Sequence, residues 1–159
     1  MKKVLFVLVV ALMTQSMVAQ AGKAVAVPYV VASAFSARFP SGQLKKWEQR
    51  KEGYVAVFRQ DGKKYFAYYK ADGTWSGTEM PIKWTKNLPP VVRKGWLKSE
   101  YASWYVRDIK KIETPDGPLY ALHMDNSPNL DSDHNYVFGE EWVVFFSEKG
   151  EIVRKDQMP

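Results

Sequence analysis

Two kinds of hydrophobic pattern alternate along the chain after residue 27. In 27–39 and 88–101 the apolar residues recur at spacings of three and four, which predicts two amphipathic helices. Elsewhere apolar and polar residues alternate one by one, as in half-buried strands. The strands predicted from this alternation cover 44–51, 54–60, 64–70, 74–84, 103–114, 119–124, 141–147 and 151–154. The chain is therefore expected to have an α+β fold.

A repeated arrangement of aromatic pairs and turn glycines divides the chain into two halves. Tyr68-Tyr69 ends four residues before Gly73, and Phe145-Phe146 ends four residues before Gly150. Each half reads as one helix followed by about four strands, which indicates an internal duplication. Because a half of this size would be marginal alone, we expect both halves to share a core. The predicted organisation is a single domain over 22–159 with repeats at about 28–86 and 87–155 and an insertion at 125–135.

The first 21 residues have the pattern of a cleavable secretory signal. Two lysines precede an uncharged run over 4–13, and Ala19-Gln20-Ala21 fits the small-x-small cleavage site, so we expect cleavage before Gly22. A membrane anchor is the alternative, but polar residues dilute the second half of the stretch, and a spanning helix needs about 20 mostly apolar residues. No later segment is apolar enough to cross a membrane. The sequence therefore predicts a periplasmic or secreted protein.

Composition excludes several classes of function. The chain has no cysteine, so it has neither disulfides nor thiol chemistry. Its formal net charge is +6, of which Lys2 and Lys3 carry two units, leaving +4 after signal removal. The remaining lysines and acids are interspersed, as on an ordinary solvated surface, and we expect no nucleic-acid partner. Aromatic residues make up 14% of the chain, enough to supply both a core and a binding surface.

Strand alternation sorts the side chains of the sheet onto two faces. The face with Arg59, Lys70, His123 and Ser147 is expected to lie away from the helices, yet it also carries many apolar residues. Large exposed apolar patches mark interaction sites. The alternative is that the insertion, the N-terminal segment or a second copy of the chain covers this face, the last giving a homodimer. The predicted binding residues of this open sheet face are Val55, Val57, Phe66, Tyr68, His123, Val143 and Phe145.

The order of these short motifs resembles a known family. A helix ends in Phe39-Pro40, a strand with Trp47 follows, Tyr68 to Trp75 reads YYKADGTW, and Leu88-Pro89 opens the second helix. This resembles the PepSY-like, beta-lactamase-inhibitor-protein-like (BLIP-like) family of exported bacterial proteins over 28–124 and 141–154. The resemblance implies a duplicated helix-plus-four-strand unit forming a curved antiparallel sheet with helices on one face. It also implies protein binding through the open sheet face, including inhibition of an envelope enzyme, but a shared fold does not carry function.

Catalytic chemistry finds little support in the sequence. None of the common nucleophile, metalloprotease or phosphate-binding motifs is present. Of the two histidines, His123 lies within a predicted strand, where a partly buried sheet residue is more common than a general base, and His134 lies in a polar loop. We therefore expect a non-catalytic protein without a cofactor, whose partner is an unidentified protein or peptide.

Two alternative functions follow from local features. The insertion is dense in oxygen ligands, and Asp125, Asp131 and Asp133 are weak candidates for a calcium or other metal site serving a metal-assisted hydrolase. The loop glycine and the bidentate glutamate of a calcium loop are missing, so a polar loop is the plainer interpretation. Trp75 and Trp84 offer a stacking surface for an envelope glycan, although core packing is the usual place for tryptophan. The basic stretch 45–51 is expected to be an edge strand whose lysines discourage aggregation.

Overall fold

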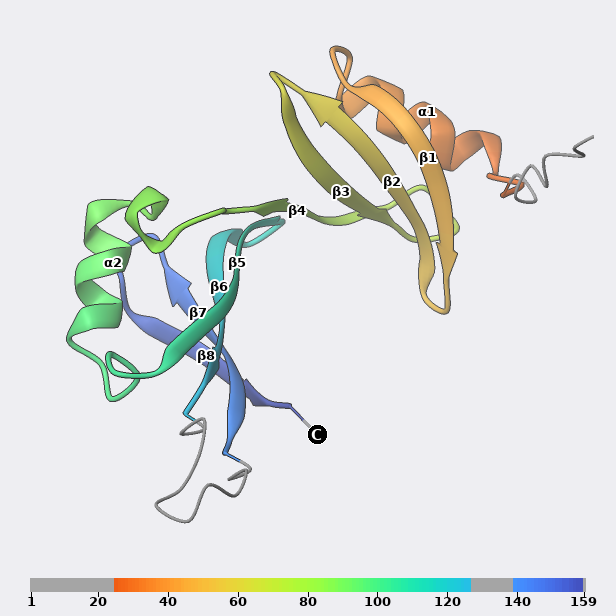
Figure 1. The fold of residues 1–159 in the computed structure, drawn as a ribbon. Helices are drawn as coiled ribbons and strands as arrows, with labels where there is room; N and C mark the ends of the chain where they lie inside the picture. The colour runs from red at the N-terminus through yellow and green to blue at the C-terminus, as the bar shows by residue number, and fades with distance from the viewer. Residues whose placement is uncertain (1–24, 127–138, 159) are drawn as a thin grey trace, which may run out of the picture.

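The computed structural model describes residues 25–126 and 139–158. It contains two α-helices, one short 3-10 helix and eight strands, coloured in chain order in Figure 1. The predicted signal segment and most of the predicted insertion lie outside the described residues. Among the described residues, no helix is long and apolar enough to cross a membrane. The elements are α1 (Tyr29–Arg38), β1 (Gln43–Arg50), β2 (Gly53–Gln60), β3 (Lys63–Tyr69), β4 (Trp75–Pro81), η1 (Thr85–Asn87), α2 (Pro90–Leu97), β5 (Tyr105–Thr114), β6 (Gly117–Asp125), β7 (Glu141–Ser147) and β8 (Ile152–Gln157).

All eight strands form one antiparallel sheet in which each strand pairs with its neighbours in the chain, in the order β1 to β8. Each half contributes one helix and four strands, so the predicted α+β fold with a helix-plus-four-strand unit in each half is confirmed. The two halves join where β4 pairs with β5 over only four residue pairs, from Thr78 with Glu113 to Pro81 with Lys110. β1 lies at one edge of the sheet, as the lysine-rich stretch predicts.

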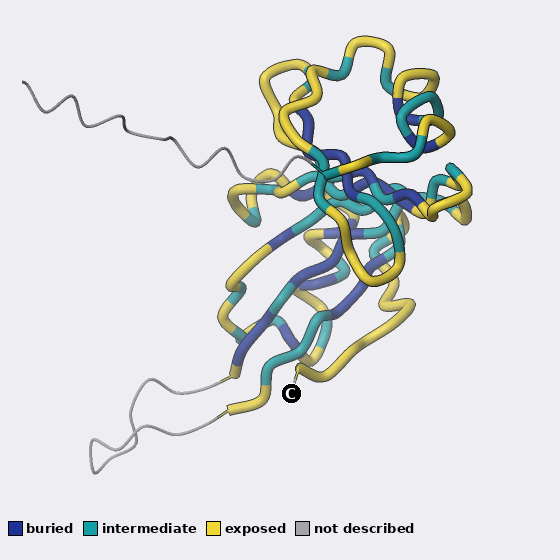
Figure 2. The backbone as a smooth tube through the Cα atoms, turned by 90° about the vertical axis from the view of Figure 1, so that its right-hand side faces the viewer, coloured by how far each residue is buried: buried dark blue, intermediate teal, exposed yellow. Residues whose placement is uncertain are grey.

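Both helices lie on the same face of the sheet, each over its own half. Figure 1 shows α1 beside β1–β3 and α2 beside β5–β8, at opposite ends of the molecule. In Figure 2 the buried backbone runs through the middle of the strands, whereas the hairpin turns are exposed. The apolar side chains under the helices form two separate clusters, one for each half, so the expectation that both halves share one core is wrong.

The first cluster packs α1 against β1–β3. Pro28 precedes the helix and Pro40 follows it, so the chain cannot extend the helix at that end. Val31 and Phe35 of α1 are buried on Ala56 and Ala67, whose small side chains leave room for the Phe35 ring. Burying one such side chain contributes roughly 2–3 kcal/mol to folding.

The second cluster packs α2 against β5–β7 through Val92 and Trp96. The indole Nε1 of Trp96 donates to the carbonyl oxygen of Tyr101 at 3.1 Å, which ties the helix to the turn that follows it. The helix ends at Leu97, four residues before its predicted end, because the Ser99 hydroxyl donates to the carbonyl oxygen of Trp96 at 2.7 Å and the chain turns there.

The predicted strand 74–84 is also too long. β4 ends at Pro81, which has no N–H to donate, and a last ladder bond from Ile82 N to the carbonyl oxygen of Ile109 spans 2.8 Å. Trp84 therefore lies beyond the strand, just before η1. Asp125, which the sequence places at the start of the insertion, is instead the last residue of β6 and pairs with Glu141.

Candidate functional site

The sheet face opposite the helices, called the open face below, carries no helix. Its members follow from strand alternation and from the register of the ladder, which joins Glu48, Val55 and Tyr68 in one row and Val57 with Phe66 in another. All seven predicted binding residues lie on this face, because their strand neighbours fill the clusters under the helices. Its principal residues are Lys46, Glu48, Arg50, Val55, Val57, Arg59, Lys64, Phe66, Tyr68, Glu79, Lys110, Ile112, His123, Asp125, Glu141, Val143, Phe145, Arg154 and Asp156.

Three of the predicted binding residues are buried rather than available on the surface. Val55 is 1% exposed, Val57 is 3% exposed and Phe145 is 6% exposed. Val55 and Val57 are short and stand between longer neighbours in their rows, whereas the guanidinium of Arg154 lies 3.8 Å from the centre of the Phe145 ring. These three residues form the floor of the open face, which corrects the expectation that they are exposed.

The other four predicted residues, Phe66, Tyr68, His123 and Val143, are half-buried and reach the surface. A surface with half-buried aromatic rings above an apolar floor can bury further apolar area without exposing any core residue. Their role in binding stays a prediction.

A pocket of about 560 Å³ opens on this face where the two halves meet. The turn between β1 and β2 forms one wall, Tyr68 and Val55 lie in the middle, and Ile112 of β5 closes the far side. Charged residues stand around this apolar centre, namely Arg50, Lys51, Glu52, Lys70 and Glu79. The pocket is large enough to accept one large side chain of a partner.

Burial raises the pKa of Tyr68 to about 12, and the neighbouring carboxylate of Glu79 adds to the increase. The phenol therefore keeps its proton at neutral pH, and it is already hydrogen-bonded to the side chain of Glu79. Glu79 also pairs with Lys110, with 3.3 Å between Nζ and Oε2. The pocket wall is thus fixed by a contact between β4 and β5, the two strands that join the halves.

Five cations on the first half of the open face, called the basic patch below, surround the half-buried aromatic residues. One acid among them, Glu48, receives two of the cations, Lys46 at 2.8 Å and Arg50 at 2.6 Å. The hydrogen bonds from Lys46 and then Arg50 hold the pKa of Glu48 below its usual value. The members of the basic patch are Lys46, Arg50, Arg59, Lys64 and Lys70.

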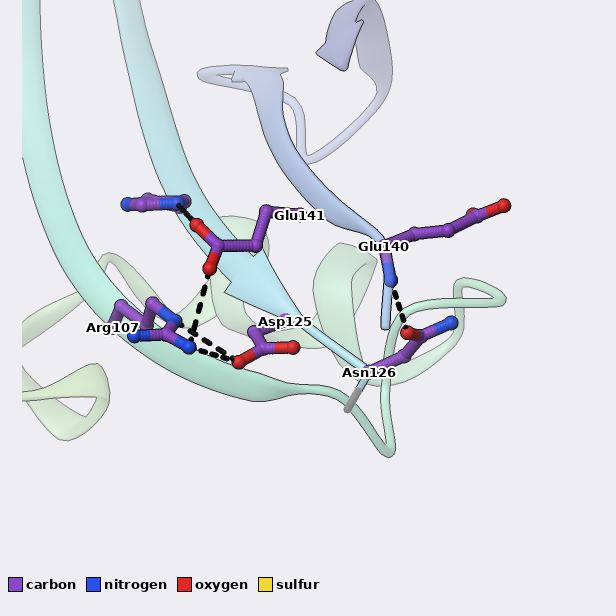
Figure 3. Close-up of polar contacts among 6 residues, drawn as sticks. Arg107, Asp125, Asn126, Glu140 and Glu141 are labelled. Atoms are coloured by element: carbon purple, nitrogen blue, oxygen red, sulfur yellow. Dashed lines mark hydrogen bonds and ion pairs between the residues drawn. The ribbon is translucent and has the colours of Figure 1, made fainter. Parts of the chain in front are cut away.

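A chain of charged groups crosses the second half of the open face (Figure 3). Arg107 lies at a β-bulge in β5, and its guanidinium binds the carboxylate of Asp125, with 3.0 Å between Nε and Oδ2. The same guanidinium lies 3.2 Å from Glu141, whose other oxygen is 2.9 Å from Nε2 of His123. The hydrogen bond to Asp125 raises the pKa of Arg107 above its usual value. The network holds β5, β6 and β7 together at the end of the sheet.

No family model matches the chain, and no curated protein matches it. Solved structures do match. A BLIP-like protein from Bacteroides fragilis is 23% identical over 85% of this chain and 89% of its own, with a TM-score of 0.71. A DUF2874 family protein from Bacteroides ovatus is 20% identical over 84% and 89%, also with a TM-score of 0.71. The chain has the BLIP-like fold. A predicted periplasmic protein from Bacteroides eggerthii shares it, at 20% identity over 84% and 90% with a TM-score of 0.66.

The BLIP-like fold confirms the predicted curved antiparallel sheet with helices on one face. It does not by itself locate a binding site, because the identities are low and a fold hosts many functions. The resemblance to PepSY-like proteins stays a prediction. None of the three structures carries the name of an enzyme.

The metal candidates are not brought together among the described residues. Asp125 is 5% exposed, and its carboxylate binds the guanidinium of Arg107, a cation that does not act as a metal ligand. Asp131, Asp133 and His134 lie outside the described residues. Within 25–126 and 139–158, no group of three or more histidine or acidic side chains could hold a metal ion.

The two tryptophans proposed for sugar stacking differ in their surroundings. Trp75 packs against the first cluster, its Nε1 donates to the Thr78 hydroxyl at 2.9 Å, and Arg38 covers its ring at 3.4 Å. Its ring is therefore already occupied. Trp84 is 54% exposed and lines a groove of about 690 Å³ together with Tyr105, which is 71% exposed.

Sequence reasoning missed the network around Arg107. Its members come from β5, β6 and β7, and Arg107 and Asp125 are 18 residues apart. The bulge that directs Arg107 toward Asp125 leaves no clear mark in the sequence. The one available signal was an aspartate at the end of an apolar strand. A carboxylate buried there is stable only when a cation pairs with it, which would have indicated a nearby arginine or lysine.

Proposed function

We propose that this chain is an exported, non-catalytic binding module that recognises a protein or peptide through its open face. The observation that carries the proposal is the sheet face without a helix, where Phe66, Tyr68 and Val143 stay half-buried above an apolar floor. An ordinary solvated face would be polar at these positions. The pocket beside Tyr68 adds a concave feature at the junction of the two halves.

Export is part of the proposal. The pattern of the first 21 residues suits a periplasmic or secreted protein, and a neighbour of the same fold is a predicted periplasmic protein. Inhibition of an envelope enzyme is one form that such binding would take. A non-catalytic role agrees with the open-face chemistry, in which the charged groups of the second half bind one another.

The test is a double variant, Phe66→Ser with Tyr68→Ser, used as bait in a pull-down from an envelope extract. We expect the variant to keep its fold, because both side chains are half-buried rather than central to a cluster, and to lose the captured partner. The matched control is Val91→Ser with Leu97→Ser, two apolar residues of α2 that are each 54% exposed on the helix side.

The control should retain the partner. If the two double variants capture it equally, the open face is not the binding surface. Unfolding of the Phe66 and Tyr68 variant, seen by circular dichroism, would place both side chains in the core and reject the proposal as well.

A second candidate is binding of an envelope glycan in the groove beside Trp84. The observation that favours it is the pair of exposed aromatic rings, Trp84 and Tyr105, along one groove. Aromatic faces of this kind stack on sugar rings. Quenching of tryptophan fluorescence by peptidoglycan fragments, abolished by Trp84→Ala, would support it, and an unchanged spectrum would exclude it.

A further inference from the structure

The two halves of the open face differ in how their charges are paired. In the second half, each cation on this face has an acid within salt-bridge distance: Arg107 binds Asp125, and Arg154 lies 3.1 Å from Asp156. Lys110 at the junction pairs with Glu79. The cations on the second half of the open face therefore pair with acids of the same chain.

The basic patch in the first half is different. Its five cations surround Glu48, which already receives two of them, while Glu52 and Glu79 stand beside the patch and Glu79 pairs with Lys110. Among the described residues, Arg59, Lys64 and Lys70 form no salt bridge with any acid. All three are exposed. The first half of the open face thus presents three exposed cations that are not held in a salt bridge within the described part of the chain.

Apolar and aromatic groups lie among these cations. The ammonium of Lys64 lies 4.7 Å from the centre of the Phe66 ring, and Lys70 lines the same pocket as Tyr68 and Val55. A partner that reaches every part of this surface must carry negative charge and also place apolar side chains against the rings. Such complementarity governs the rate and specificity of protein association.

A polypeptide fits this surface better than a uniform polyanion does. Glu48, Glu52 and Glu79 stand on or beside the patch and would repel a chain with a charge at every repeat. A polypeptide can alternate acidic with apolar side chains, as the surface itself alternates cations with rings. The pocket of about 560 Å³ has room for a single aromatic side chain of such a segment.

We propose that the partner presents an acidic segment to the basic patch, with one of its aromatic side chains in the pocket beside Tyr68. This inference rests on the proposed function and specifies the chemistry of the partner. The cations around Tyr68 pair with carboxylates of the segment and draw the segment to the face before contact. The second half of the open face contributes shape rather than charge.

The test measures binding of rhodamine-labelled 12-residue peptides by fluorescence anisotropy at 50 and 200 mM salt. An alternating glutamate and tyrosine peptide should bind, at least fivefold more tightly than an alternating glutamate and serine peptide. A lysine and tyrosine peptide should not bind. Because exposed charges are screened by salt, the affinity should fall severalfold at the higher salt concentration.

The decisive variants reverse two exposed cations each. Lys64→Glu with Lys70→Glu should weaken binding of the glutamate and tyrosine peptide at least tenfold. Arg93→Glu with Lys94→Glu, on the exposed side of α2, changes the net charge of the protein by the same amount and should alter binding less than twofold. Equal losses in the two variants would show a nonspecific charge effect and overturn the inference.

Heparin and phosphatidylglycerol vesicles serve as the other anionic probes. If either binds more tightly than the glutamate and tyrosine peptide, the ligand is a polyanion or a lipid surface and the inference is wrong. No binding of that peptide at 50 mM salt also overturns it. The proposed function would survive those results if the Phe66 and Tyr68 variant still lost its partner in the pull-down, so the two failures are distinguishable.

Discussion

Gly95 of α2 lies directly against Gly150 in the turn between β7 and β8. A β-carbon on Gly95 would collide with the carbonyl oxygen of Gly150, so the helix can sit this low on the sheet only because both positions lack a side chain. The first half uses a related contact, in which the turn residue Gly73, at φ +87°, faces Val30 of α1. In each half a turn glycine lies under the helix.

Gly95→Ala is therefore expected to destabilise the protein. Alanine in a helix interior normally gains about 1 kcal/mol over glycine, but here the clash with backbone atoms outweighs that gain. We expect a net loss of about 2 kcal/mol in the free energy of unfolding, typical of overpacking. Urea denaturation measures it, with Lys94→Ala on the exposed side of the same helix as the control. A stabilised Gly95→Ala variant would contradict the close contact.

Tyr69 supplies a second prediction. Its side chain is 2% exposed, and within the described part of the chain its hydroxyl has no hydrogen-bond partner. Replacing it with phenylalanine removes a hydroxyl whose burial without a hydrogen bond costs free energy of folding. We expect Tyr69→Phe to leave stability at pH 7 unchanged or to raise it by up to about 1–2 kcal/mol. A clear loss in thermal denaturation would mean that the hydroxyl is satisfied.

The same tyrosine makes stability depend on alkaline pH. Burial raises the pKa of Tyr69 to about 12, whereas a tyrosine in the unfolded chain titrates near 10. The unfolded chain therefore releases this proton first, and the contribution to stability is complete below pH 10 and declines as pH rises toward 12. Between these values the melting temperature should fall less steeply in Tyr69→Phe than in the natural sequence. Parallel curves would contradict the pKa assigned to Tyr69.

The pairing of Arg107 with Asp125 predicts an unequal response to mutation. The side chain of Asp125 is 7% exposed, whereas that of Arg107 is 45% exposed. Arg107→Met leaves a carboxylate in the interior without its cation, while Asp125→Asn leaves a guanidinium that water and Glu141 still reach. The first variant should therefore have the lower melting temperature, and the double variant should recover part of the loss. The reverse order would contradict the burial of Asp125.

Local signals in the sequence predicted most of the fold. Proline pairs and hydrophobic spacing located both helices, and the repeated turn glycines, Gly73 and Gly150, predicted the two matching units. The ends of elements were less accurate: the strand was predicted to run through Trp84 although β4 ends at Pro81, and the predicted helix to Tyr101 overlooked the hydroxyl of Ser99. At α2 a single hydroxyl marks the end of the helix, whereas β4 ends at a residue that has no N–H to donate.

The candidate site was predicted in part. Strand alternation placed all seven residues on the face away from the helices, where the structure has them, because period two depends only on local geometry. It did not predict that Val55 and Val57 are covered by larger side chains in adjacent strands, since that depends on register. The imbalance of charge between the halves likewise appears only when residues far apart in the chain are placed on one surface.

Photo-crosslinking from the open face tests the central claim most directly. A benzophenone amino acid is placed at Tyr68, and in a separate variant at Val91 on the helix side, and each protein is irradiated in its native host. The account predicts a discrete protein adduct from position 68 and none from position 91. Adducts from position 91 alone, or the same adducts from both positions, would contradict recognition through the open face.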